Sequence, residues 1–142
     1  MWKYLLSNEL YLVIWATLFF CVLAPTTAPA TDLTISSARI GVHPDATRFV
    51  LESSGPIPYR IFALSEPHRI VIDLPEVYWR VDLNETDVIA QSTGVVSNFR
   101  YGLFRPGNSR VVIDIKAPVK VKRHFVLPPK DGGPYRFVVD LE

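Results

Sequence analysis

The residues best suited to chemistry lie in the segment Arg100-Tyr-Gly-Leu-Phe-Arg105, which places two guanidinium groups and two aromatic rings close together. Arginine forks bind carboxylates through paired hydrogen bonds, and aromatic rings stack on the apolar faces of sugars. After residue 30 the chain has ten arginines and four lysines. These residues suit a polymer of amino-sugars whose attached peptides carry carboxylates.

A related segment lies earlier in the chain, where Arg39 and His43 stand in the places equivalent to the Arg100–Arg105 segment. The alternative interpretation is that Tyr101 and Phe104 belong to the core and that the arginines only solvate an edge strand. The predicted binding residues are Arg39, His43, Arg100, Tyr101 and Arg105.

The sequence shows no recognisable catalytic constellation. Its histidines, His43, His68 and His124, lack the close spacing that puts two metal ligands on one face, and zinc needs several convergent ligands. There is no GxSxG motif and no glycine-rich phosphate loop. The one cysteine, Cys21, allows neither an internal disulfide nor a CxxC site. We therefore expect no catalytic residue, metal site or cofactor within this chain.

Four acidic residues recur at equivalent places along the chain, which favours a structural role at the ends of strands over paired catalytic carboxylates. The expected partners of these acids are arginines on neighbouring strands. The acids are Glu52, Asp73, Asp114 and Asp140, and the arginines are Arg48, Arg69, Arg110 and Arg136.

The body of the chain repeats itself with a period of about 62 residues. Within each copy, four runs rich in Val, Ile, Phe and Tyr are bounded by Pro, Gly, Asn and Asp, which predicts four strands. Arg39, Gly41, Pro44 and Arg48 correspond to Arg100, Gly102, Pro106 and Arg110. The predicted strands are 33–42, 47–53, 57–65 and 68–74 in the first copy, and 95–103, 109–116, 119–127 and 135–141 in the second.

A four-stranded unit of this size does not bury its own apolar face, but two such units can cover each other. The sequence therefore predicts an all-β fold with two four-stranded sheets packed face to face about a pseudo-twofold axis. The connector 75–94 joins the two copies, and the best candidate for a helix is a short one within 84–92.

The segment 1–30 has the features of a signal peptide for export. Leu10 to Ala24 is an apolar run without charge, shorter than the roughly 20 residues that a membrane-spanning helix needs. Ala28-Pro29-Ala30 fits a cleavage site, so the mature domain is predicted as 31–142, and an uncleaved membrane anchor is the alternative. For the chain of 142 residues, 49% hydrophobic content excludes general disorder, and a net charge of +1 argues against a nucleic-acid binder.

Several longer motifs resemble a known family. They are Arg39-Ile-Gly-Val-His-Pro-Asp, Tyr59-Arg-Ile-Phe, Pro67-His-Arg-Ile-Val-Ile-Asp-Leu-Pro-Glu, Arg100-Tyr-Gly-Leu-Phe-Arg-Pro-Gly and Pro134-Tyr-Arg-Phe-Val-Val-Asp-Leu-Glu. In this order they resemble the AMIN domain, the N-terminal region of exported N-acetylmuramoyl-L-alanine amidases, over about 35–142. The same domain type occurs in secretin subunits of pili and secretion systems.

The resemblance implies a symmetric pair of sheets and a periplasmic, non-catalytic module that binds peptidoglycan and localises an amidase for cell-wall remodelling and cell separation. In that family a zinc-dependent catalytic domain follows, and none of its motifs occurs here, so zinc is expected only in such a domain. The chain is expected to be either a piece of an amidase or a free-standing targeting module. The alternative function is a protein–protein adaptor that docks on a division or secretin component through a sheet edge.

Overall fold

The computed structural model describes residues 32–81 and 93–142. The predicted signal peptide, 1–30, and the predicted short helix within 84–92 lie outside these residues. In the described part of the chain, every regular element is a β-strand. None of the described residues forms a helix long and apolar enough to cross a membrane.

The strands follow one another mainly as antiparallel hairpins, and most of their bounds agree with the sequence prediction to within a few residues. Pro44 and Pro106 lie in the turns of two equivalent hairpins, where proline stops the strand and favours the turn. The strands are β1 (Thr34–His43), β2 (Ala46–Ser53), β3 (Arg60–Ser65), β4 (His68–Pro75), β5 (Tyr78–Trp79), β6 (Val96–Arg105), β7 (Asn108–Ile115), β8 (Val121–Leu127) and β9 (Tyr135–Leu141).

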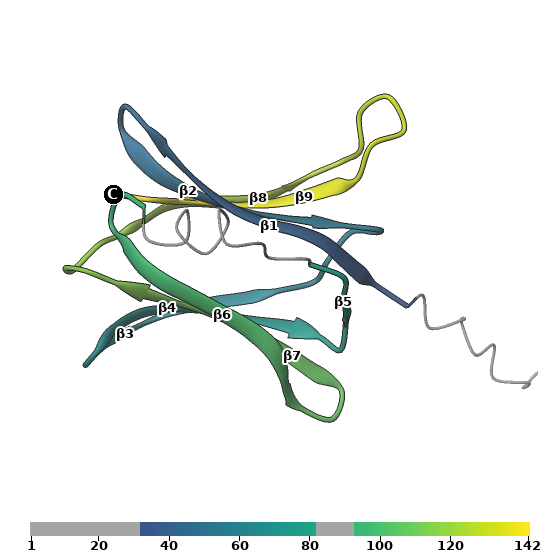
Figure 1. The fold of residues 1–142 in the computed structure, drawn as a ribbon, viewed down its shortest axis with the longest axis horizontal. Coiled ribbons are helices and arrows are strands. Elements are labelled where there is room, and N and C mark those ends of the chain that lie inside the picture. The colour runs from purple at the N-terminus through teal and green to yellow at the C-terminus, as the bar shows by residue number, and fades with distance from the viewer. Residues whose placement is uncertain (1–31, 82–92) are drawn as a thin grey trace, which may run out of the picture. The chain divides into compact units, whose positions relative to one another are not determined.

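Two sheets pack face to face (Figure 1), which confirms the predicted fold class. One sheet has the strand order β5-β1-β2-β9-β8 and the other has the order β3-β4-β7-β6. The first sheet has one strand more than expected because β5, which is two residues long, pairs in parallel with the start of β1. The other pairings are antiparallel.

The two sequence repeats do not form one sheet each, because each sheet takes one hairpin from each repeat. In the five-stranded sheet, β2 of the first copy pairs with β9 of the second. In the four-stranded sheet, β4 of the first copy pairs with β7 of the second. These pairings place β2 beside β9 and β4 beside β7 inside their sheets, where both edges of each strand are hydrogen-bonded. The two copies are therefore interlocked rather than stacked.

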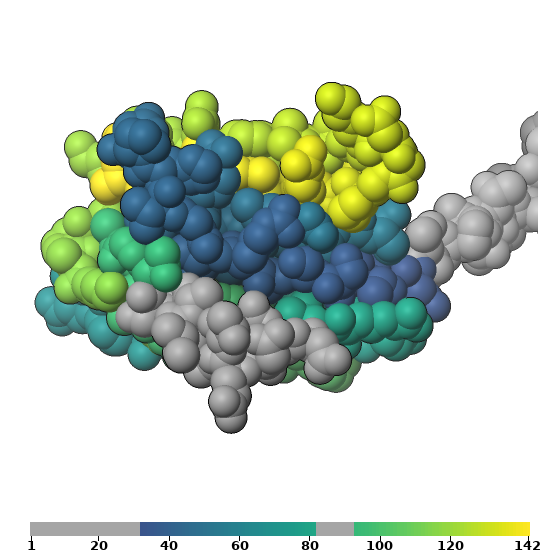
Figure 2. Space-filling model, turned by 45° about the horizontal axis from the view of Figure 1, so that its top comes forward, coloured from purple at the N-terminus to yellow at the C-terminus, as the bar shows by residue number. Residues whose placement is uncertain are grey.

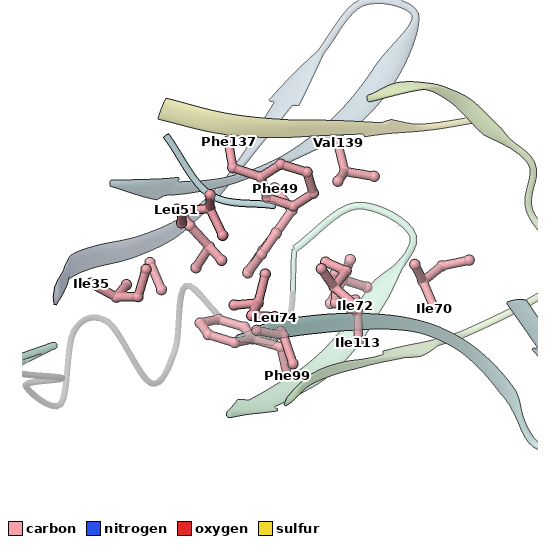
Figure 3. Close-up of a cluster of buried hydrophobic side chains, with 14 of the residues drawn as sticks. Ile35, Phe49, Leu51, Ile70, Ile72, Leu74, Phe99, Ile113, Phe137 and Val139 are labelled. Carbon is pink, nitrogen blue, oxygen red and sulfur yellow. The ribbon is translucent and has the colours of Figure 1, made fainter. Parts of the chain in front are cut away.

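The core lies between the sheets and is built from alternate residues of the central strands (Figure 3). The ring of Phe49 on β2 meets the ring of Phe99 on β6 edge-on, with centroids 5.2 Å apart, and this contact joins the two sheets. Phe137 on β9 lies beside Tyr59, with ring centroids 4.4 Å apart. Aliphatic side chains fill the rest of this layer, among them Ile35, Leu51, Ile70, Ile72, Leu74, Ile113 and Val139.

Irregularities of the strands also repeat. The β1–β2 pairing shifts register between Ile35 and Ser37, and the β6–β7 pairing shifts between Val96 and Asn98, at the equivalent place. A second shift, between Leu103 and Arg105, has no counterpart in the first hairpin. It adds one residue, Phe104, to the second copy.

Candidate functional site

The outer surfaces of the two sheets carry the same pattern of side chains. Residues that alternate with the core residues face outward, and the strand registers align them in three rows across each sheet. In the order β1, β2, β9, β8, the rows of the five-strand face are Gly41, Arg48, Asp140, Arg123; then Arg39, Val50, Val138, Phe125; then Ser37, Glu52, Arg136, Leu127. In the order β6, β7, β4, β3, the rows of the four-strand face are Gly102, Arg110, Asp73, Arg60; then Arg100, Val112, Val71, Phe62; then Asn98, Asp114, Arg69, Leu64.

The first row of each face is centred on an arginine–aspartate pair that joins the two repeats. Arg48 donates from Nε and Nη2 to the two carboxylate oxygens of Asp140, at 2.6 and 2.9 Å. Arg110 donates in the same way to Asp73, at the same two distances. A bidentate pair of this kind is stronger and more specific in geometry than a single hydrogen bond. The two pairs therefore hold equivalent central strands together at symmetric places.

The carboxylate of Asp140 is the more deeply enclosed of the two. Its side chain has no exposed surface, and it also accepts a hydrogen bond from Nε of Arg123. Hydrogen bonds from Arg48, and to a smaller extent from Arg123, lower the pKa of Asp140 well below its ordinary value, although burial acts to raise it. The hydrogen bonds from Arg110 lower the pKa of Asp73 in the same direction.

The other two acids also pair with arginines across strands, as the sequence predicts. Arg39 lies 2.7 Å from Glu52, and Asp114 accepts hydrogen bonds from both Arg69 and Arg100. The predicted partners of Asp73, Asp114 and Asp140 are thus confirmed. Arg136 is the exception: it stands opposite Glu52 in register, but Glu52 pairs with Arg39 instead.

Aromatic rings accompany the arginines on the four-strand face. The guanidinium carbon of Arg110 lies 3.6 Å from the ring centroid of Phe104 and 5.9 Å from that of Phe62. Arg60 and Arg105 add longer contacts to the same two rings, each at 6.0 Å. Because cation–π attraction acts within about 6 Å, Arg110 is held between its carboxylate partner and these rings. Phe104 is still 52% exposed, so its ring is available to a ligand and is not a core residue.

The structure places the predicted binding residues on two opposite surfaces. Arg39 and His43 lie on the five-strand face, where both line a cavity of about 240 Å³. Arg100 lies on the four-strand face, and Arg105 is at its end beside Phe104. The segments that are equivalent in sequence are thus equivalent in position, one on each sheet.

Tyr101 faces the other way. Its ring stacks on Trp79 at 4.4 Å and packs against the core, and its hydroxyl donates to the carbonyl oxygen of Val81 at 3.4 Å. Tyr101 is therefore on the inner side of the strand that presents Arg100, as the alternative interpretation expects for this residue. Its packing supports the position of β6.

Sequence reasoning missed the outer residues of the edge strands. Arg60 and Phe62 on β3 correspond to Arg123 and Phe125 on β8, and each arginine lies 6.0 Å from the phenylalanine ring of its own strand. The signal was present as the repeated pattern Arg-x-Phe-x-Leu at 60–64 and 123–127. It is short enough to escape notice until the registers bring the two copies into equivalent rows.

Together these features define a class, a two-sheet β-sandwich domain made from an internal repeat, with the same arginine- and phenylalanine-bearing pattern on both outer faces. Among residues 32–81 and 93–142, no group of three or more His, Cys, Asp or Glu side chains is arranged to hold a metal ion.

Comparison with known proteins identifies the family within this class. The family model described as "AMIN domain" matches residues 37–141, and the chain belongs to the AMIN domain family. N-acetylmuramoyl-L-alanine amidase AmiC of Neisseria meningitidis serogroup B is 33% identical to it over 107 residues, which are 75% of this chain and 26% of that protein. The protein of the same name from Escherichia coli O6:H1 is 32% identical over 108 residues, with the same shares. The chain thus spans 26% of the length of either relative.

Proposed function

We propose that this domain is a non-catalytic peptidoglycan-binding module that localises an N-acetylmuramoyl-L-alanine amidase in the periplasm for cell-wall remodelling and cell separation. The observation that carries the proposal is the repetition of one arginine and phenylalanine pattern on both outer faces of the sandwich. The internal repeat places the same pattern on both surfaces, and a ligand that is itself a repeating polymer can contact both of them.

The chemistry of the faces fits such a polymer. The exposed ring of Phe104 on the four-strand face offers an apolar plane for a sugar, and arginines on both faces offer forks for the carboxylates of the attached peptides. Two faces on one domain allow two weak contacts with one glycan mesh, so the overall affinity exceeds that of either contact. We infer that Arg39 and His43 act on one face and that Arg100 and Arg105 act on the other, with Tyr101 as their support.

The test is co-sedimentation of residues 31–142 with purified peptidoglycan sacculi. This segment contains the whole described core, so it is expected to fold without residues 1–30. We expect pelleting at low salt that weakens at high salt, because screening over about 10 Å at 0.1 M shortens to about 3 Å at 1 M. The supernatant is expected to contain no released muropeptides. Failure to pellet at low salt, or release of fragments, would contradict the proposal.

A paired variant tests the assignment on the four-strand face. Arg100→Ala with Arg105→Ala is expected to weaken sedimentation about tenfold, the loss expected for one strong charged contact. The melting temperature should change little, because Asp114 keeps Arg69 as a partner and exposed ion pairs contribute at most about 1 kcal/mol. Lys120→Ala with Lys130→Ala removes the same charge elsewhere on the exposed surface and serves as the control. Equal loss in both variants would refute the site assignment.

The adaptor function makes a different prediction in the same experiment. Large apolar side chains are exposed on strands at the edges of the four-stranded sheet, namely Leu64 on β3 and Leu103 on β6. Such residues suit an added strand or a protein partner. If the domain fails to pellet with sacculi but is pelleted with membranes that contain a secretin or division protein, the adaptor function replaces the peptidoglycan function.

A further inference from the structure

The five-strand face contains a hollow lined by several arginines. A cavity of about 240 Å³ lies on this face and includes the guanidinium-bearing residues Arg39, Arg48 and Arg136, together with His43. Figure 2 shows the surface dipping between the β1–β2 hairpin, in blue, and the loop that joins β8 to β9, in yellow. The apolar lining comes from Ile40, Val50, Leu127 and Val138.

The described lining of this cavity has cationic groups and no carboxylate. Arg39 and Arg48 are compensated from outside the lining, by Glu52 and Asp140. Arg136 has no such compensation: within 32–81 and 93–142 its side chain makes no ion pair and no hydrogen bond. Because Arg136 is half-buried and no described residue pairs with its guanidinium, this planar fork is available to bind a carboxylate through two parallel hydrogen bonds.

The four-strand face lacks this arrangement although its rows are equivalent. Arg69, the counterpart of Arg136, is already hydrogen-bonded to Asp114 at 2.7 Å. Arg110, the counterpart of Arg48, is covered by the ring of Phe104 at 3.6 Å. Phe104 is the residue that the second register shift adds to β6, and β1 has no equivalent of it. The extra residue therefore distinguishes a covered face from a hollow one.

We propose that the cavity on the five-strand face is a binding site for the C-terminal carboxylate of a short peptide. Arg136 binds the carboxylate, and the ring of His43 offers a hydrogen-bonding nitrogen at the rim. Val50 and Val138 supply apolar lining beside the carboxylate. This inference rests on the proposed function in one respect, since the peptides attached to peptidoglycan are the expected source of the carboxylate.

The test is a titration of isotope-labelled residues 31–142, followed by amide chemical shifts. The probes are N-acetyl-D-alanyl-D-alanine and the same dipeptide with its C-terminus amidated. We expect the acid to shift the amides of Gly41, Val50 and Val138, with saturation in the millimolar range. The amidated probe should shift them little. Equal shifts from both probes, or shifts centred on Gly102 and Val112 of the four-strand face, would overturn the assignment.

A matched pair of variants identifies the charged group. Arg136→Gln should weaken binding of the acid at least about tenfold, since it removes the charge and the fork while keeping the length of the side chain. Arg69→Gln, at the equivalent place on the opposite face, should leave the dissociation constant of the acid within about twofold of its value for the parent domain. Equal weakening in the two variants would overturn the role of Arg136. Both variants are first compared with the parent domain by melting temperature and by the spread of amide shifts.

The outcome with sacculi separates this inference from the proposed function. If sacculi are bound but the dipeptide acid gives no shifts at the cavity, the carboxylate site is refuted and the targeting function stands. If the dipeptide binds at the cavity but sacculi are not bound, the carboxylate site stands and the targeting function is refuted.

Discussion

The enclosed carboxylate of Asp140 provides the sharpest test of how the two repeats are held together. Its two oxygens accept hydrogen bonds from Nε and Nη2 of Arg48 and from Nε of Arg123. The Asp140→Asn substitution keeps the shape of the side chain but replaces one acceptor oxygen with an amide that faces a guanidinium donor. It also removes the negative charge that both arginines share. At least one charged hydrogen bond is lost, and the others are weakened.

The magnitude follows from comparison with the equivalent aspartate. Loss of one hydrogen bond to a charged group costs about 1.5–3 kcal/mol, and breaking a buried pair costs about 3–5 kcal/mol. The side chain of Asp140 has 0% exposure, but its partners Arg48 and Arg123 remain 29% and 55% exposed, so water relieves part of the loss. We expect about 3 kcal/mol for Asp140→Asn. Asp73→Asn should cost about 1.5–2 kcal/mol, because Asp73 is 21% exposed and, among the described residues, accepts hydrogen bonds from Arg110 alone.

The assay is urea unfolding of the two variants and the parent domain, with melting temperatures as a second measure. At about 4 °C per kcal/mol for a domain of this size, Asp140→Asn should melt about 12 °C lower. Asp73→Asn should melt about 6–8 °C lower. The two sites are equivalent in strand, register and pair geometry. The difference between the two variants in free energy of unfolding therefore reports the effect of the second arginine and of the deeper burial. If Asp73→Asn destabilises as much as Asp140→Asn, or more, the reasoning is refuted.

The paired aspartates and the glycines with positive φ also affect the stability of the fold. Because the folded-state pKa values of Asp140 and Asp73 are lowered, their contribution to stability is complete above the unfolded pKa of about 3.9 and is lost as pH falls toward the lower folded values. Urea unfolding between pH 6 and 2 should show this loss of stability. Asp140→Asn should reduce the dependence of the free energy of unfolding on pH, and an unchanged dependence would argue that Asp140 does not cause it. Gly94→Ala should cost at least about 2 kcal/mol, since Gly94 has φ +60° and an added Cβ would lie 2.2 Å from Oγ1 of buried Thr47. Gly107→Ala, with φ +81° but open space around it, should cost about 1 kcal/mol in the same assay. Equal losses of stability in the two glycine variants would argue against a steric effect of Thr47 at position 94.

Much of the fold could be predicted because it depends on local patterns. The repeat, the strands and the facing sheets follow from periodic apolar residues and from turn residues such as Pro44 and Pro106. The pairing of Asp73, Asp114 and Asp140 with arginines also followed, because an acid and a base that recur at fixed strand positions meet when strands are paired.

The candidate site was harder to predict, because strand registers decide which side chains share a face. A shift of one residue turns a side chain from the core to the solvent. Arg100 and Tyr101 are neighbours in the sequence, yet one faces outward and the other stacks on Trp79 inside. The predicted cluster was therefore divided between a surface and its support.

By itself, the amino-acid sequence determined that this chain is an all-β domain of two related halves, with its charged groups arranged as arginine–acid pairs. Only the tertiary structure decided that the halves exchange hairpins, so that Arg48 and Arg110 each meet an aspartate of the other half. It also decided that Glu52 pairs with Arg39 and leaves Arg136 unpaired in the described structure. The reason is that alternation along a strand is a local property, whereas the partner of a strand is chosen by packing between segments distant in the chain.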